Sequence, residues 1–209
     1  MELITKYFAG LSGTQLQQFR QLEQIFRDWN AKVNLISRKD IENLYEHHVL
    51  HSLAIAKVFQ FQDGAEILDV GTGGGFPGVP LAILFPQVQF LLIDGTLKKI
   101  KVVQDVIQQL GLQNVRAQQA RAEELKKQRF DFVVTRAVAT LPQLLTWCQR
   151  LAKEKHRHSL PNGLIALKGG NLKAEIKALP KGEYAETYPI SGFFEEPYFE
   201  GKFVVYLQL

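Results

Sequence analysis

The residues Asp69-Val70-Gly71-Thr72-Gly73-Gly74-Gly75-Phe76-Pro77-Gly78 decide the fold, because they close a short apolar run that begins at Ile67. A glycine-rich turn at the carboxyl end of a strand lets a ligand approach the backbone and starts a helix whose N–H groups face outward. Five glycines lie within the eight residues from Gly71 to Gly78. That density favours a ligand-binding loop over a tight turn that binds nothing.

The spacing of these glycines separates two classes of nucleotide ligand. A dinucleotide loop follows the pattern G-x-G-x-x-G, and counted from Gly71 the sixth position is Phe76 rather than glycine. The chain instead carries an acid two residues before Gly71. A carboxylate would repel a pyrophosphate, whereas Asp69 can accept a charge-assisted hydrogen bond from the cationic amino group of S-adenosyl-L-methionine. The loop, with Asp69, Gly71 and Gly73, therefore predicts a site for that cofactor.

Downstream of the loop, β-rich runs alternate with segments of helical spacing. The predicted strands are 67–70, 89–93, 115–117, 130–134, 164–167, 183–190 and 202–209. The predicted helices are 79–84, 97–110, 122–127, 141–151 and 172–179, with none between the last two strands. This alternation is typical of an α/β fold with a mostly parallel sheet. The terminal hairpin predicts a methyltransferase-type (Rossmann-like) seven-stranded sheet with one antiparallel strand.

The first 60 residues have a different pattern. Apolar side chains recur at steps of three and four over residues 14–33, which predicts an amphipathic helix capped by Ser12 or Thr14. A second helical stretch is expected from about Ile41 to Phe59. We therefore divide the chain into an N-terminal helical extension, 1–60, and an α/β domain, 61–209.

Composition limits the class of protein further. The 209 residues fit one domain, and the single cysteine, Cys148, suits a reducing compartment. The chain shows neither a signal segment nor an apolar run of membrane-spanning length, so we expect a soluble cytoplasmic protein that binds no membrane. A net charge of +4 decides little about partners. Basic clusters around Lys98, Lys126 and Lys153 are typical of solvated surface, although together they permit a polyanionic substrate.

The second predicted strand ends in an acid, Asp94. An acid about 20 residues after the glycine loop is placed to bind the ribose hydroxyls of an adenosine. Dehydrogenases share this feature, so the first loop alone discriminates between the two cofactors.

The sequence resembles, over essentially its whole length, the bacterial small-subunit ribosomal RNA guanine-N7 methyltransferases (the RsmG, or GidB, family). The most specific match is the segment 68–83, where Gly75-Phe76-Pro77-Gly78 is followed by Val79-Pro80-Leu81-Ala82. Further matches are Trp29-Asn30 with Asn34-Leu35 and Arg38, the segment 47–53, Asn114-Val115, 121–124, 135–139 and 167–169. One departure is Gly95 after Asp94, where the family more often has serine.

The resemblance implies an enzyme that transfers a methyl group from S-adenosyl-L-methionine to N7 of a guanine in 16S ribosomal RNA. It implies that Gly71 and Phe76 line the cofactor, that Ala122 and Glu123 bracket the adenine, and that Arg136 reaches the active site. The expected partner is ribosomal RNA or the assembled small ribosomal subunit, and the expected state is a monomer. Arg121, Arg136 and Lys168, at loop or strand ends, are the best substrate candidates, because arginine stacks on bases and forks onto guanine or phosphate. Asn34 and Arg38 are candidates on the resemblance.

Methylation at guanine N7 fits a sequence that lacks the motifs of amino-group and cytosine-C5 methyltransferases. N7 has an exposed lone pair and no proton to lose, so positioning carries most of the catalysis and neither a general base nor a covalent nucleophile is needed. No Asp/Asn-Pro-Pro-Tyr/Phe segment follows the fourth strand, and Cys148 has apolar helical neighbours that favour a buried structural thiol.

His47 and His51 share a helical face and could suggest a metal site. Without an intervening Glu-x-x or a cysteine partner, a structural or RNA-contacting role is favoured over metal binding. Two other functions stay open at this point. One is a nicotinamide-dependent oxidoreductase, which Asp69 and Phe76 disfavour, and the other is a cofactor-binding RNA chaperone without activity.

Overall fold

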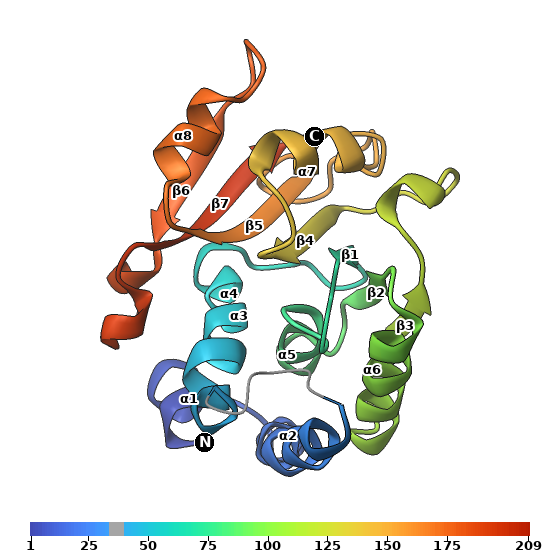
Figure 1. Ribbon diagram of the computed structural model, residues 1–209, viewed down its shortest axis with the longest axis vertical. Coiled ribbons are helices and arrows are strands. Elements are labelled where there is room, and N and C mark those ends of the chain that lie inside the picture. The colour runs from blue at the N-terminus through green and yellow to red at the C-terminus, as the bar shows by residue number, and fades with distance from the viewer. Residues whose placement is uncertain (34–39) are drawn as a thin grey trace.

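The fold is organised around one seven-stranded sheet, seen in a computed structural model that describes residues 1–33 and 40–209 (Figure 1). The predicted substrate candidates Asn34 and Arg38 lie outside the described residues. The strands are β1 (Glu66–Val70), β2 (Gln89–Asp94), β3 (Val115–Gln119), β4 (Phe132–Arg136), β5 (Gly163–Gly169), β6 (Ala185–Pro189) and β7 (Lys202–Gln208). All seven predicted strands are present, which confirms the α/β fold class.

The strand order β3-β2-β1-β4-β5-β7-β6 determines where a ligand can bind. β1 to β5 pair in parallel, and β7 runs antiparallel to both β5 and β6, as the predicted terminal hairpin requires. The chain order reverses between β1 and β4, so the loops after these two strands diverge and leave a crevice at their carboxyl ends. The glycine loop follows β1 and therefore lies at this crevice.

Helices cover both faces of the sheet (Figure 1). On one face α5 (Gly78–Leu84) and α6 (Leu97–Gln109) share a buried apolar cluster with the helical extension. On the other face α7 (Leu141–Cys148) and α8 (Leu172–Lys177) pack over a second cluster. Successive residues of a strand point to opposite faces, and accordingly Ile67 belongs to the first cluster and Leu68 to the second.

The extension is joined to the α/β domain by packing and by hydrogen bonds. Its main helix, α2 (Gly13–Lys32), begins at a capping box in which Ser12 and Gln15 exchange side-chain to backbone hydrogen bonds, so the cap is Ser12. Phe19 and Phe26 are buried against the domain, and the amide of Gln15 also donates to the carbonyl of Ile83 at 2.9 Å. The short helix α1 (Glu2–Tyr7) precedes it.

Three predictions of helical structure need correction. The stretch expected as one helix over 41–59 is a 3-10 turn (Ile41–Asn43), a π-helix (Leu44–Leu50) and two short α-helices, α3 (His51–Leu53) and α4 (Ile55–Val58). The helix expected over 122–127 is a single 3-10 turn, Ala122–Glu124, because Leu125 leaves the helical region at φ −80 and ψ 61. Between β6 and β7, where none was expected, lie two 3-10 turns, Ile190–Gly192 and Pro197–Phe199.

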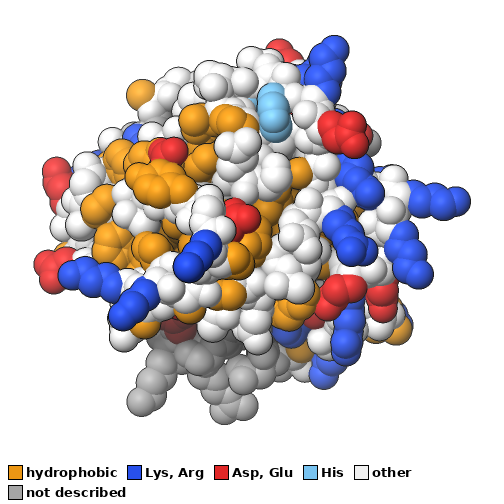
Figure 2. Space-filling view, turned by 90° about the horizontal axis from the view of Figure 1, so that it is seen from above, with side chains coloured by type: hydrophobic (Ala, Val, Ile, Leu, Met, Phe, Trp, Pro, Cys, Tyr) orange, Lys and Arg blue, Asp and Glu red, His pale blue; other side chains and the backbone are white. Residues whose placement is uncertain are grey.

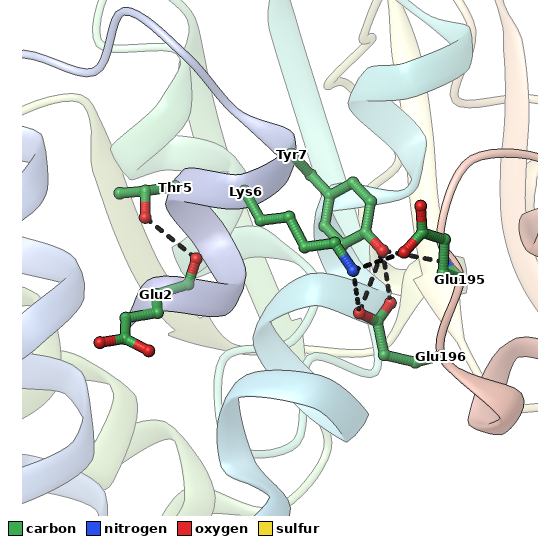
Figure 3. Close-up of polar contacts among 6 residues, drawn as sticks. All are labelled: Glu2, Thr5, Lys6, Tyr7, Glu195 and Glu196. Carbon is green, nitrogen blue, oxygen red and sulfur yellow. Dashed lines mark hydrogen bonds and ion pairs between the residues drawn. The ribbon is translucent and has the colours of Figure 1, made fainter.

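The N-terminal helix α1 is tied to the segment between β6 and β7 (Figure 3). Lys6 pairs with Glu195 at 2.8 Å and with Glu196 at 3.3 Å. The hydroxyl of Tyr7 donates to the Glu196 carboxylate at 3.0 Å and accepts from the backbone N–H of Glu195 at 2.9 Å. These contacts hold the segment that follows β6 against the extension. Within residues 1–33 and 40–209, no helix is long and apolar enough to cross a membrane.

Candidate active site

The glycine loop has the backbone conformation that its composition predicts. Gly71, Gly73 and Gly75 have φ values of +70°, +58° and +100°, a region that favours glycine. The N–H of Gly73 donates to the Asp94 carboxylate at 3.1 Å, which ties the loop to the end of β2. The loop is therefore held open by its own glycines and fixed by the neighbouring strand.

Asp69 is buried beneath this loop rather than exposed at its rim. Its Oδ2 accepts from the hydroxyl of Thr72 at 2.7 Å and from the N–H of Gly78 at 2.9 Å. Its Oδ1 is buried and has no hydrogen-bond partner in the described part of the chain. Burial raises the pKa of this carboxyl to about 7, and the hydrogen bonds from Thr72 and Gly78 offset only part of that rise. One oxygen of Asp69 thus orders the loop, while the other is an unsatisfied acceptor.

A pocket of about 220 Å³ opens beside the loop, and we name it the cofactor pocket. Its lining comprises Val70, Gly71, Ile93, Asp94, Gly95, Ala120, Arg121, Ala122, Glu123, Val138 and Trp147. Five residues predicted for the cofactor or the substrate therefore meet here: Gly71, Asp94, Arg121, Ala122 and Glu123. Asp94 accepts from the N–H of Thr96 at 2.9 Å as well as from Gly73, so its carboxylate also shapes the turn after β2.

The loop after β4 lies across the glycine loop. Ala137 has φ +54°, the one such value among the described non-glycine residues, and Val138 is 39% exposed. A Cβ placed on Gly71 would lie 2.6 Å from Cγ2 of Val138, so the valine side chain rests directly on that glycine. The segment 137–139 therefore covers one side of the cofactor pocket at the cost of backbone strain.

A second pocket, of about 410 Å³, lies on the other side of this segment, and we name it the histidine pocket. It is lined by His47, His48, His51, Arg136, Ala137, Leu167, Lys168, Gly169, Tyr198 and Lys202. Its walls come from the extension, from the ends of β4 and β5, and from the segment before β7. Both pockets thus lie at the crevice that the strand order predicts.

Arg136 joins the extension to the sheet inside the histidine pocket. Its guanidinium donates to the carbonyl of His47 at 3.2 Å and to Nδ1 of His48 at 3.0 Å, and lies 5.0 Å from the ring centre of Phe76. Burial lowers the pKa of Arg136 to about 10, which leaves it charged at neutral pH. Phe76, which the resemblance predicts to line the cofactor, packs on Arg136, Phe26 and His48 and is not among the residues that line the cofactor pocket.

The contacts of His48 determine its protonation. Arginine only donates, so Nδ1 of His48 must accept from Arg136, and Nε2 then carries the proton and donates to Asp40 at 2.6 Å. Burial, reinforced by the charge of Arg136, lowers the pKa of His48 to about 4. His47 also contacts Asp40 and stacks on Tyr198 with ring centres 3.7 Å apart. His48 thus holds the pocket wall as a neutral, hydrogen-bonded ring.

Lys168 points its ammonium inward. Nζ donates to the carbonyl of Ala139 at 2.8 Å and pairs with Glu175 at 2.8 Å, and only 9% of the side chain is exposed. These contacts fix the segment after β4 to β5, so the lysine acts on that segment before it can act on a substrate. Among the described residues, no three His, Cys, Asp or Glu side chains gather as a metal site requires.

The basic clusters differ in how much charge they present. Lys153 forms ion pairs with Glu66 at 2.6 Å and with Asp131 at 3.0 Å, so its charge is already neutralised within the chain. Lys126, Arg129 and Arg150 instead line a groove of about 560 Å³ that shares Ala122, Glu123 and Trp147 with the cofactor pocket. Figure 2 shows Lys and Arg side chains on both sides of the face seen from above, with the larger group on the right. The groove next to the cofactor pocket is therefore the better candidate for phosphate contacts.

The sheet, the acid beneath the glycine loop and the pocket at the switch point define the class of S-adenosylmethionine-dependent methyltransferases. The profile of the family described as "rRNA small subunit methyltransferase G" (GidB) matches residues 15–189. The chain belongs to this family.

Relatives named ribosomal RNA small subunit methyltransferase G support this family assignment. The protein of Flavobacterium psychrophilum is 54% identical over 100% of this chain and 98% of its own length. That of Bacteroides thetaiotaomicron is 53% identical over 100% of both. Among solved structures, a SAM-dependent methyltransferase from Aquifex aeolicus has a TM-score of 0.56 at 18% identity, covering 82% of this chain and 98% of that one. A mutant of MtNAS in complex with S-adenosylmethionine has a TM-score of 0.59 at 13% identity, covering 93% and 76%. The solved structures support the fold alone.

Proposed function

We propose that this chain transfers a methyl group from S-adenosyl-L-methionine to N7 of a guanine in small-subunit ribosomal RNA. The observation that carries the proposal is the pair of pockets on either side of residues 137–139, one beside the glycine loop and one walled by Arg136 and the histidines. Two adjoining pockets suit a donor and an acceptor that must meet.

The residues of the cofactor pocket fit the methyl donor. Asp94 and the backbone of Gly71 and Gly95 offer polar atoms for a ribose, and Ala122 with Trp147 offers apolar surface for an adenine. The unpartnered Oδ1 of Asp69 is a ready acceptor for an ammonium group beneath the glycine loop. When bound, the cofactor supplies an electrophilic methyl group on a sulfonium.

The protein's contribution is to position the base and to exclude water. N7 of guanine needs no proton removed, so the neutral His48 and His51 are not required as bases. Arg136 holds the wall of the histidine pocket to β4, and its charge can face the electron-rich O6 edge of guanine. Val138 must leave Gly71 if the amino-acid part of the cofactor is to reach that backbone.

We further propose that the protein acts as a monomer in the cytoplasm, where ribosomes are assembled. Residues 1–60 are proposed to be an extension of the methyltransferase domain 61–209. Whether naked RNA or the assembled subunit is preferred can be decided by comparing both as substrates.

The test is transfer of a labelled methyl group to ribosomal RNA from cells that lack this enzyme, followed by mass spectrometry of the nucleosides. We expect label only in 7-methylguanosine of the small-subunit RNA. Label in another nucleoside would overturn the N7 assignment. Saturable NADH binding without S-adenosylmethionine binding would favour an oxidoreductase, and cofactor binding without any transfer would favour an RNA chaperone.

A further inference from the structure

The histidine pocket contains one buried acceptor that the contacts described above leave unused. His51 lines the pocket, is 7% exposed, and its Nε2 has no hydrogen-bond partner among residues 1–33 and 40–209. An unsatisfied buried polar atom costs free energy, so it calls for a functional explanation. None of the contacts that hold the pocket together uses this atom.

The chemistry of this nitrogen follows from its partner ring atom. The backbone of His47 favours a proton on the ring of His51, and a carbonyl can only accept, so the ring nitrogen on that side bears the proton. Since Nε2 has no partner, that nitrogen is Nδ1, and in the neutral ring Nε2 carries a lone pair. Burial, followed by the charges of Arg136 and Lys202, lowers the pKa of His51 to about 3, so the ring is neutral at physiological pH.

The other polar side chains that line the pocket present mostly donors. Arg136, Lys168 and Lys202 are cationic and have no acceptor. Guanine matches this arrangement, because its O6 accepts while its N1–H and N2–H₂ donate. Adenine presents an acceptor where guanine has N1–H, and would place a lone pair against Nε2.

Access to Nε2 depends on Tyr198. Two rings lie edge-to-face against His51: Phe199, which is fully buried, and Tyr198, which is half-buried and lines the pocket. Tyr198 lies in a short 3-10 turn between β6 and β7, so it is the ring that can yield to an entering base.

We propose that Nε2 of His51 accepts a hydrogen bond from the N1–H or N2–H₂ edge of the target guanine and so selects guanine over adenine. The inference rests on the proposed function and adds the group that reads the base. N7 lies across the purine from that edge, so the same contact turns N7 away from His51.

The test compares binding of GMP and AMP to the full chain saturated with S-adenosylhomocysteine. We expect the native protein to prefer GMP by about tenfold, the worth of roughly one hydrogen bond. His51→Phe keeps a ring of similar shape but has no acceptor, and its preference should fall to near one, with cofactor affinity unchanged within about twofold. The matched control is His158→Phe, because His158 also has a buried unpartnered ring nitrogen and an aromatic neighbour, Phe132, but lines neither pocket.

A second measurement does not depend on a variant that folds. In ¹⁵N-histidine-labelled native protein, GMP should shift the lone-pair nitrogen of His51 toward the hydrogen-bonded range, and AMP should not. A native protein without GMP preference, or a folded His51→Phe protein that keeps it, overturns the inference. Methyl transfer to ribosomal RNA by the native protein is measured separately, so a failure of the proposed function is distinguished from a failure of base reading.

Discussion

Arg136 at the end of β4 donates to Nδ1 of His48 in the π-helix of the extension, with 3.0 Å between the two nitrogens. The two residues are 88 positions apart in the chain. This bond, with the neighbouring one to the His47 carbonyl, makes the extension a wall of the site rather than an appendage.

Arg136→Ala should therefore impair both stability and cofactor binding. The sequence alone predicted that folding would be largely spared, but two hydrogen bonds and the contact with Phe76 are lost, which we expect to cost about 2–3 kcal/mol of unfolding free energy. Cofactor affinity should fall by about one to two decades. Denaturant titration and calorimetry measure the two effects. Arg116→Ala, at an exposed position of β3, is the control and should change neither.

Gly71→Ala should abolish cofactor binding, because its Cβ would lie 2.6 Å from Val138 and its φ is +70°. Gly111→Ala is the matched control: its φ is +64° and its Cβ would meet nothing within 4 Å. Both substitutions should destabilise the chain by about 1 kcal/mol through the backbone alone. If Gly71→Ala and Gly111→Ala lost cofactor binding equally, the glycine loop would not be part of the cofactor site.

Val138→Ala should strengthen cofactor binding by at least about threefold. The valine rests on Gly71, and a ligand that needs this contact opened binds with an apparent affinity reduced by the fraction of open molecules. A shorter side chain favours the open form. Calorimetry with S-adenosylhomocysteine checks this, and weaker binding would mean that the valine contacts the cofactor instead of excluding it.

Asp69→Asn should change the pH dependence of stability. The pKa of Asp69 is raised from an ordinary value of 3.8 to about 7, so between these values the folded state holds a proton that the unfolded state has lost. The unfolding free energy of the native protein therefore falls as pH rises from about 4 to 7. Asparagine cannot ionise, so the variant should gain on the order of 2 kcal/mol relative to the native protein between pH 5 and pH 8. Urea titrations of both proteins at pH 5 and at pH 8 measure this change in relative unfolding free energy. If the pKa of Asp69 were near 3.8, the change would be close to zero.

Cys148→Ala should retain methyl transfer. The thiol is buried at the last residue of α7, and burial raises its pKa to about 12, so it is protonated at neutral pH and cannot serve as a nucleophile. The lost packing should cost about 1 kcal/mol. A folded variant without activity in single-turnover assays would point to covalent catalysis.

Local patterns predicted the sheet and the glycine loop because both depend on near neighbours in the sequence. Strand boundaries lie within about two residues of those expected, and Ser12 caps the first long helix. The helix expected over 122–127 is not present, because the length of this segment depends on contacts with residues distant in the sequence. Its apolar spacing arises from Ala122 and Leu125 packing under α7, which needs only one turn.

The candidate site was predicted in part. Asp94, Arg121, Ala122 and Glu123 meet Gly71 in one pocket, as the carboxyl ends of parallel strands require. Tyr198, Lys202 and Val138 were missed, because they reach the site through long-range packing that periodicity does not encode. The three histidines were noticed as neighbours on a helix, but only the fold shows which of their nitrogens are engaged.

The tie between Lys6, Tyr7 and the segment around Glu196 has a consequence for the nascent chain. The histidine pocket takes its wall from residues 47–51 and its closing side from Tyr198 and Lys202, which are synthesised last among the lining residues. A chain still being translated has no closed histidine pocket until Lys202 has emerged from the exit tunnel. The pocket proposed to hold the base is therefore completed only when nearly the whole chain has been made.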